Sequence, residues 1–77
     1  MAEYEIDDEW SDLIPVAAGN YVQMTRGSRV YISAASTNMD ANCILLRVEK
    51  AIEIRSATSI RARTRSGEGR IQVVTGL

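Results

Sequence analysis

A stretch of strict alternation near the C-terminus constrains the fold more than any other feature of this sequence. Over residues 60–65, Ile60 and Ala62 alternate with Arg61, Arg63 and Arg65. A period of two places successive side chains on opposite faces of an extended strand, so one face is apolar and the other bears guanidinium groups. A glycine-containing turn over 66–69 and a β-branched run over 70–75 follow. The pattern predicts a C-terminal β-hairpin with a ladder of arginines on its outer face.

The same period recurs earlier in the chain. Residues 21–25 and 29–34 each alternate apolar and polar side chains, and a short glycine-containing connection separates them, so we expect a second hairpin over 20–34. Residues 10–16 predict a short strand that Pro15 confines to a sheet edge, because proline cannot donate to a ladder. The polar run 35–42 has neither periodicity and predicts a loop.

The segment 42–55 admits two interpretations. Residues 43–48 are apolar enough for a strand buried on both faces at its start, and residues 51–55 alternate through Ile52 and Ile54. A helix is the main competitor, since Leu45, Val48 and Ile52 lie near helical spacing. The richness in Ile and Val favours strands. We therefore expect an all-β fold, a small antiparallel β-sandwich or barrel of about six or seven short strands.

The chain is short for an independent core. At 77 residues it has room for one domain, and a chain of this size buries only about 60% of the surface that its unfolded form exposes. Small domains usually add disulfides, a metal or a partner chain. With Cys43 as its one cysteine and no histidine, an internal disulfide or a zinc site lacks ligands. We expect no catalytic residues, no metal and no cofactor, and hence no enzyme, with association between chains as the supplement.

Charge is distributed unevenly along the chain. Six of the ten acidic residues and no basic residue lie in residues 1–12, so all nine bases lie in 13–77. We therefore divide the chain into an acidic N-terminal arm, 1–9, and a single β domain, 10–77, and expect the arm to pair with a basic surface on a neighbour. The bases are arginines except Lys50, and arginine suits forked contacts to carboxylate or phosphate.

The arginine-rich strands are the one feature on which a functional hypothesis can rest. Arginine is enriched at protein interfaces, where lysine and glutamate are depleted. A basic sheet face with tyrosines could instead bind an oligonucleotide, but a net charge of −1 gives weak non-specific attraction to nucleic acid. We favour a protein interface, with nucleic acid as the alternative. The residues that we expect at this protein interface are Arg61, Arg63, Arg65, Arg70, Arg29, Tyr31, Trp10, Glu5, Asp7 and Asp8.

The sequence offers no targeting signal. Its first residues lack the basic start and apolar run of a signal peptide, and no apolar stretch approaches the roughly 20 residues of a membrane span. We expect no membrane association, and a protein that is made and kept in a cytosolic compartment or in a particle assembled there.

A resemblance to a known class of proteins rests on four segments and on the polar loop between the first two segments and the last two. The segments are residues 20–25, 29–32, 60–64 and 69–75. In composition and spacing the chain resembles small β-structured virion proteins of tailed bacteriophages, such as head decoration proteins, head-anchored fibre domains and tail-associated proteins. The resemblance implies a non-enzymatic virion component, assembled in the host cytoplasm. It also implies a homotrimer, or a protein docked at a symmetry axis, whose partners are other virion proteins, either the major capsid protein or a tail or portal protein.

Overall fold

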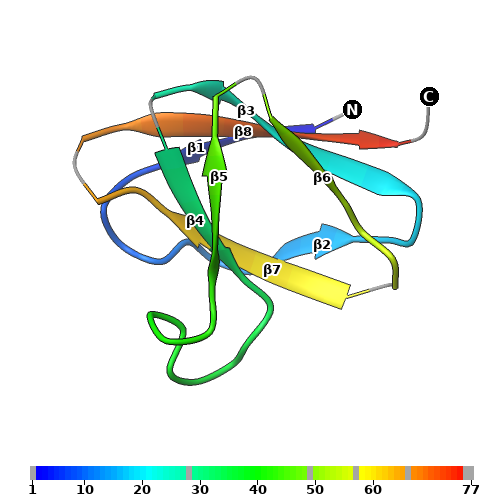
Figure 1. Ribbon diagram of the computed structural model, residues 1–77, viewed down its shortest axis with the longest axis horizontal. Helices are drawn as coiled ribbons and strands as arrows, with labels where there is room; N and C mark the ends of the chain where they lie inside the picture. Colours follow the sequence, from blue (N-terminus) through cyan, green and yellow to red (C-terminus); the bar gives the residue numbers. More distant parts are fainter. Residues whose placement is uncertain (1, 28, 49, 57, 66, 76–77) are drawn as a thin grey trace.

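The chain folds into two four-stranded antiparallel sheets, as shown by a computed structural model (Figure 1). The described residues contain eight strands and no helix, which confirms the all-β prediction with slightly more strands than expected. The structure describes residues 2–27, 29–48, 50–56, 58–65 and 67–75. The strands are β1 (Ala2–Ile6), β2 (Ile14–Val16), β3 (Asn20–Arg26), β4 (Arg29–Ser33), β5 (Ile44–Arg47), β6 (Ala51–Glu53), β7 (Thr58–Arg63) and β8 (Gly69–Thr75).

The pairing follows a simple rule. The first four strands pair with the last four in reverse order, β1 with β8, β2 with β7, β3 with β6 and β4 with β5. This folded ribbon then curls, so that β8 also pairs with β3 and β7 with β4. The resulting sheets have the orders β1-β8-β3-β6 and β2-β7-β4-β5. Eight strands joined in this way form a jelly roll, a sandwich of two interlocked Greek keys.

Both predicted hairpins are wrong. Strands β3 and β4 are neighbours in the chain but belong to opposite sheets, and so do β7 and β8. The alternation was identified correctly, since Ile60 and Ala62 are buried between the sheets. A period of two shows that one face of a strand is covered, but it does not show which strand lies alongside. The glycine turns between these strands are crossings from one sheet to the other.

The acidic N-terminal segment belongs to the first sheet. Residues 2–6 form β1, which pairs with β8 over its whole length, from Ala2 opposite Val73 to Ile6 opposite Gly69. Ile6 is buried in the core. The expected arm of residues 1–9 is therefore a strand over most of its length, because alternate residues of β1 supply an apolar face.

The core lies between the sheets and is built from the alternate residues of every strand. The side chains of Val22, Val30 and Ile71 are fully buried at its centre. Two buried polar side chains are hydrogen-bonded: the Ser33 hydroxyl donates to the Asn42 carbonyl at 2.6 Å, and the Thr64 hydroxyl to the Gly67 carbonyl at 2.7 Å. Neither hydroxyl is buried without a partner, so neither adds the free-energy cost of an unpaired polar group. This suits a domain with little apolar area to bury.

Strands, and not a helix, occupy residues 42–55, as β5 and β6. The expectation that the first of these strands is buried on both faces is wrong. Strand β5 pairs only with β4 among the described residues and forms a sheet edge, so Ile44 and Leu45 remain 49% and 40% exposed. Pro15, in contrast, lies on the edge strand β2, as proline's missing donor predicts. The expected turn at residues 49–50 falls partly outside the described residues.

Two of the connections that cross between the sheets, β3–β4 and β7–β8, approach each other at Gly27. It has a φ of +98°, and a Cβ there would lie 2.7 Å from the Met24 Cε and 3.2 Å from the Glu68 carbonyl oxygen. Gly67, in the other crossing, has a φ of +77° with no atom within 4 Å of a Cβ. The two glycines therefore share a left-handed backbone but differ in the space around them.

Gly27→Ala is expected to lower stability more than Gly67→Ala. An alanine in the left-handed region costs about 1–2 kcal/mol at either site, and Gly27→Ala adds the displacement of Met24. The measurement is the urea midpoint of each variant. Equal midpoints would show that the crossings do not pack together as described.

Candidate functional site

Arginines gather on the outer face of the sheet β2-β7-β4-β5. On this face Tyr31 lies opposite Arg63 on one side and opposite Leu45 on the other, and Arg29 lies opposite Arg47. The alternation of β4, β5 and β7 produces this arrangement, because the intervening residues of each strand point into the core. We call this surface the arginine face. It comprises Arg29, Arg47, Arg61, Arg63 and Arg65.

Two aromatic rings anchor part of the arginine face. The guanidinium carbon of Arg65 lies 4.8 Å from the centre of the Tyr31 ring, and that of Arg63 lies 5.8 Å from the Trp10 ring. Asp40 links this group, since it accepts from the Trp10 indole at 3.2 Å and lies 3.5 Å from an Arg63 nitrogen. Cation–π contacts of this kind contribute about 0.5–1 kcal/mol at exposed sites. They fix the direction of two of the cations.

Arg61 is held differently. Its Nη1 donates to the Ser11 carbonyl at 3.4 Å, while its Nε is buried without a hydrogen-bond partner. The Ser11 backbone also joins β7, donating to the Ala62 carbonyl at 3.0 Å. The connection between β1 and β2 therefore runs along β7 and covers part of Arg61.

Arg29 and Arg47 are the exposed pair. They lie directly opposite each other on β4 and β5, and among the described residues no ion pair joins either of them to a carboxylate. Like charges opposite each other in a sheet are destabilising unless an anion lies between them. Asp40 is the one acid that pairs with the arginine face within the described chain. The face therefore has a surplus of positive charge available to an outside partner.

Arg70 and Glu5, which the sequence grouped with these residues, lie elsewhere. They face each other on β8 and β1 in the other sheet, where the Arg70 Nε donates to a Glu5 oxygen at 3.1 Å. Glu3 lies 3.9 Å from the same guanidinium. The arginine ladder expected over 61–70 is thus split between the two outer faces of the sandwich. Arg70 binds carboxylates of its own chain, so it is not evidence for an external partner.

Asp7 and Asp8 lie in the exposed connection between β1 and β2. The Asp7 backbone carbonyl accepts from the Thr64 amide at 2.7 Å, and its side chain accepts from the Glu9 amide at 2.9 Å. Asp7 thus organises a turn beside the end of β7. Neither aspartate forms an ion pair with an arginine among the described residues.

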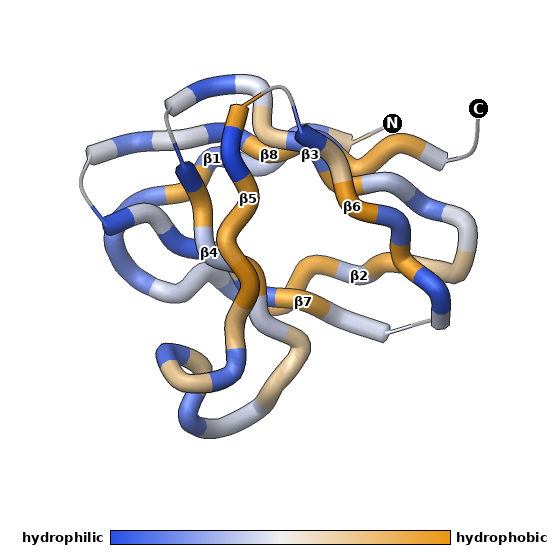
Figure 2. Tube along the Cα trace, viewed as in Figure 1, coloured by the Kyte–Doolittle hydropathy of each residue, from blue (hydrophilic) through white to orange (hydrophobic). Residues whose placement is uncertain are grey.

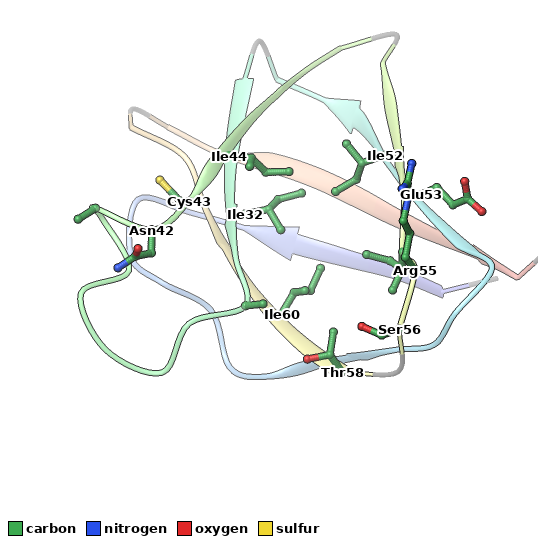
Figure 3. Close-up of a pocket in the computed structure, with 13 residues that line it drawn as sticks. Ile32, Asn42, Cys43, Ile44, Ile52, Glu53, Arg55, Ser56, Thr58 and Ile60 are labelled. Carbon is green, nitrogen blue, oxygen red and sulfur yellow. The ribbon is translucent and has the colours of Figure 1, made fainter.

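Sequence reasoning missed an apolar pocket where the two sheets part between β5 and β6. Figure 3 shows Ile32, Ile44, Ile52 and Ile60, one from each of four strands, projecting towards a common space. Figure 2 shows a hydrophobic stretch in β5, and hydrophobic residues alternating with hydrophilic ones along β6. Its volume of about 560 Å³ falls in the range of roughly 300–1,000 Å³ that ligand pockets occupy. The polar side chains of its rim include Asn42, Glu53, Arg55, Ser56 and Thr58.

Cys43 lies on the pocket rim. Its thiol contacts the Asp40 carbonyl at 3.6 Å, and it is a free cysteine. In the described part of the chain no three potential ligands among histidine, cysteine, aspartate and glutamate come together to hold a metal ion. The same residues include no helix long and apolar enough to cross a membrane. The groups that the pocket offers a ligand are its isoleucine side chains and the hydrogen-bonding side chains of its rim.

Comparison of this chain with known protein families, with characterised proteins and with solved structures finds no match. Function is therefore inferred from the two surfaces themselves.

The contact between Arg70 and Glu5 is expected to lower the pH at which the Glu5 carboxyl group titrates. The hydrogen bond and charge of Arg70 lower the pKa of Glu5, and Arg26 lowers it further by a smaller amount. Since the pKa is lowered in the folded state, the pair stabilises the fold above the ordinary glutamate pKa. That stabilisation is lost as the pH falls through the lowered value. In an NMR titration of the Glu5 carboxyl carbon, Arg70→Gln should raise the midpoint towards the ordinary value.

Arg26→Gln is the matched control, because it removes the same charge from a neighbouring strand and should raise the Glu5 midpoint less. Equal effects of the two substitutions would show that general charge, and not the Arg70 contact, sets the pKa.

Proposed function

We propose that this chain is a non-enzymatic structural protein of a phage virion, acting as a homo-oligomer, whose arginine face binds an acidic surface of another virion protein. The observation that supports the proposal is the surplus of cations on one sheet face, above all the exposed and opposed Arg29 and Arg47. Guanidinium groups form two-pronged hydrogen bonds with carboxylates, so several arginines on a rigid sheet match a surface of spaced acidic side chains.

The jelly roll supports the virion setting by analogy. Viral capsid domains are a large group with this architecture, alongside lectins and cupins. Fold by itself does not assign function, so the argument for binding rests on the arginine face. A subunit that binds only the assembled shell stabilises it by mass action, in proportion to its occupancy of the sites. This is the physical action that we propose.

An oligonucleotide is the second candidate, because the rings of Tyr31 and Trp10 lie against two cations of the arginine face. Sequence-tolerant binding of single strands uses such rings as platforms on which bases stack. Here the guanidinium groups of Arg65 and Arg63 already lie over these rings. A base would have to displace a cation that also contributes to phosphate binding. The arrangement therefore favours a carboxylate-bearing protein over nucleic acid.

The double substitution Arg29→Gln with Arg47→Gln is expected to weaken binding to a fluorescent polyglutamate peptide, measured by anisotropy. Exposed ion pairs contribute about 0.2–1 kcal/mol each, so the loss should be roughly two- to thirtyfold. Its matched control is Arg26→Gln with Arg55→Gln, which removes the same charge away from the arginine face. Equal losses in both would indicate unspecific attraction. Tighter binding of oligothymidylate than of polyglutamate at physiological salt would favour the nucleic-acid alternative.

The virion setting has its own test. Phage particles produced from the genome that encodes this chain are purified by density gradient and analysed by quantitative mass spectrometry. The proposal expects peptides of this chain in a fixed ratio to the major capsid protein. Their absence from infectious particles would overturn it, whatever the peptide-binding result.

A further inference from the structure

The four edge strands of the sandwich differ in how well they are protected from pairing with another chain. An exposed sheet edge offers unpaired backbone groups, and proteins blunt such edges with short strands, proline or charge. Strand β2 has three residues and includes Pro15, and β6 has three residues and ends at Glu53. Strand β1 bears Glu3 and Glu5. Strands β2 and β6 thus have two protective features each, whereas β1, with five residues and no proline, is protected by charge alone, which an oppositely charged strand can neutralise.

Strand β5 has less of that protection, with Arg47 at its end as its one charged residue. Its sequence is Ile-Leu-Leu-Arg, with no proline, and its first two side chains are 49% and 40% exposed. Val48, which follows it, is 46% exposed. Among the described residues, β5 pairs with β4 alone. The edge that is open to another strand is therefore also the edge where apolar side chains remain uncovered, and covering them is favourable by about 25 cal/mol per Å².

Charge decides which strand fits this edge. A two-fold β5–β5 pairing would join two strands that each carry Arg47 and no carboxylate, so neither strand could neutralise the cation of the other. Strand β1 carries the opposite charge, and it carries it on its outward face, as β5 does with Arg47. Its Glu3 and Glu5 point outward with side chains 52% and 68% exposed, while Ile6 points into the core. Placed beside β5, β1 of another copy would bring carboxylates next to Arg47 on the outer face and apolar residues next to the exposed Ile44, which shares the inward face of β5 with the buried Leu46.

We propose that the free edge of β5 pairs with the free edge of β1 in a second copy of this chain. This inference rests on the proposed homo-oligomer and assigns its interface. The pairing joins the sheet β2-β7-β4-β5 of one copy to the sheet β1-β8-β3-β6 of the next. Because the two edges differ, the contact is head-to-tail, so successive copies form a closed ring or an open filament.

Charge reversal tests the pairing. Arg47→Glu and Glu3→Arg should each raise the dissociation constant of self-association at least tenfold, because each places like charges together. The double variant, Arg47→Glu with Glu3→Arg, should restore assembly, since every interface then has the reversed pair. Glu3 is chosen over Glu5 because Glu5 makes the closer contacts with Arg70. Assembly is followed by sedimentation velocity over a series of micromolar concentrations.

Two matched controls, Arg55→Glu and Glu68→Arg, make the same charge changes at exposed positions outside both edges and should leave assembly unchanged. Circular dichroism and urea midpoints confirm that every variant is folded. Assembly that is strengthened by Arg47→Glu and unaffected by Glu3→Arg would overturn the pairing in favour of a two-fold β5–β5 contact. A wild-type chain that stays monomeric throughout would also overturn it, yet could still be present in virions, so this failure is distinguishable from failure of the proposed function.

Discussion

The burial of alternate side chains between two sheets is the constraint on which the rest of this structure depends. Each strand contributes only a few residues to the core, among them Val22, Val30 and Ile71 at its centre. A chain of 77 residues cannot spare a whole strand to solvent. The folded ribbon satisfies this constraint because neighbouring strands such as β3 and β4 pass to opposite sheets and face each other across the core. The sandwich stays open between β5 and β6, and the isoleucine pocket and the uncovered edge of β5 both follow from that opening.

The arginines of this chain serve two different purposes. Arg70 holds β1 through Glu5, and Arg63 holds the β4–β5 loop through Asp40, so these cations contribute to the fold of their own chain. Arg29 and Arg47 have no such carboxylate among the described residues. The surface charge is therefore unevenly distributed. Cations lie on the outer face of one sheet, and acidic residues are concentrated on β1 and the connection after it. That division is the basis of the proposed contacts between copies and with acidic partners.

Local pattern was enough to predict the class of the fold but not its connectivity. The alternation at Ile60, Ala62 and their arginine neighbours located β7, and the excess of β-branched residues separated strands from helix in 42–55. Local pattern could not predict which strands pair, because strands such as β1 and β8 pair although they are far apart in the sequence. For the same reason the arginines of 61–70 were assigned to one surface. The cluster of Tyr31, Trp10 and Asp40 and the isoleucine pocket depend on loops and sheet edges that no local spacing encodes.

The pairing of β1 with β8 has a consequence for how the molecule forms. Ala2 lies opposite Val73, and β8 separates β1 from β3, so the first sheet is incomplete until β8 has been synthesised. Strand β4 meets β5 after a single loop, which is the shortest closure in the ribbon. Loop closure over long separations slows folding. These separations favour early pairing of β4 with β5 and late pairing of β1 with β8.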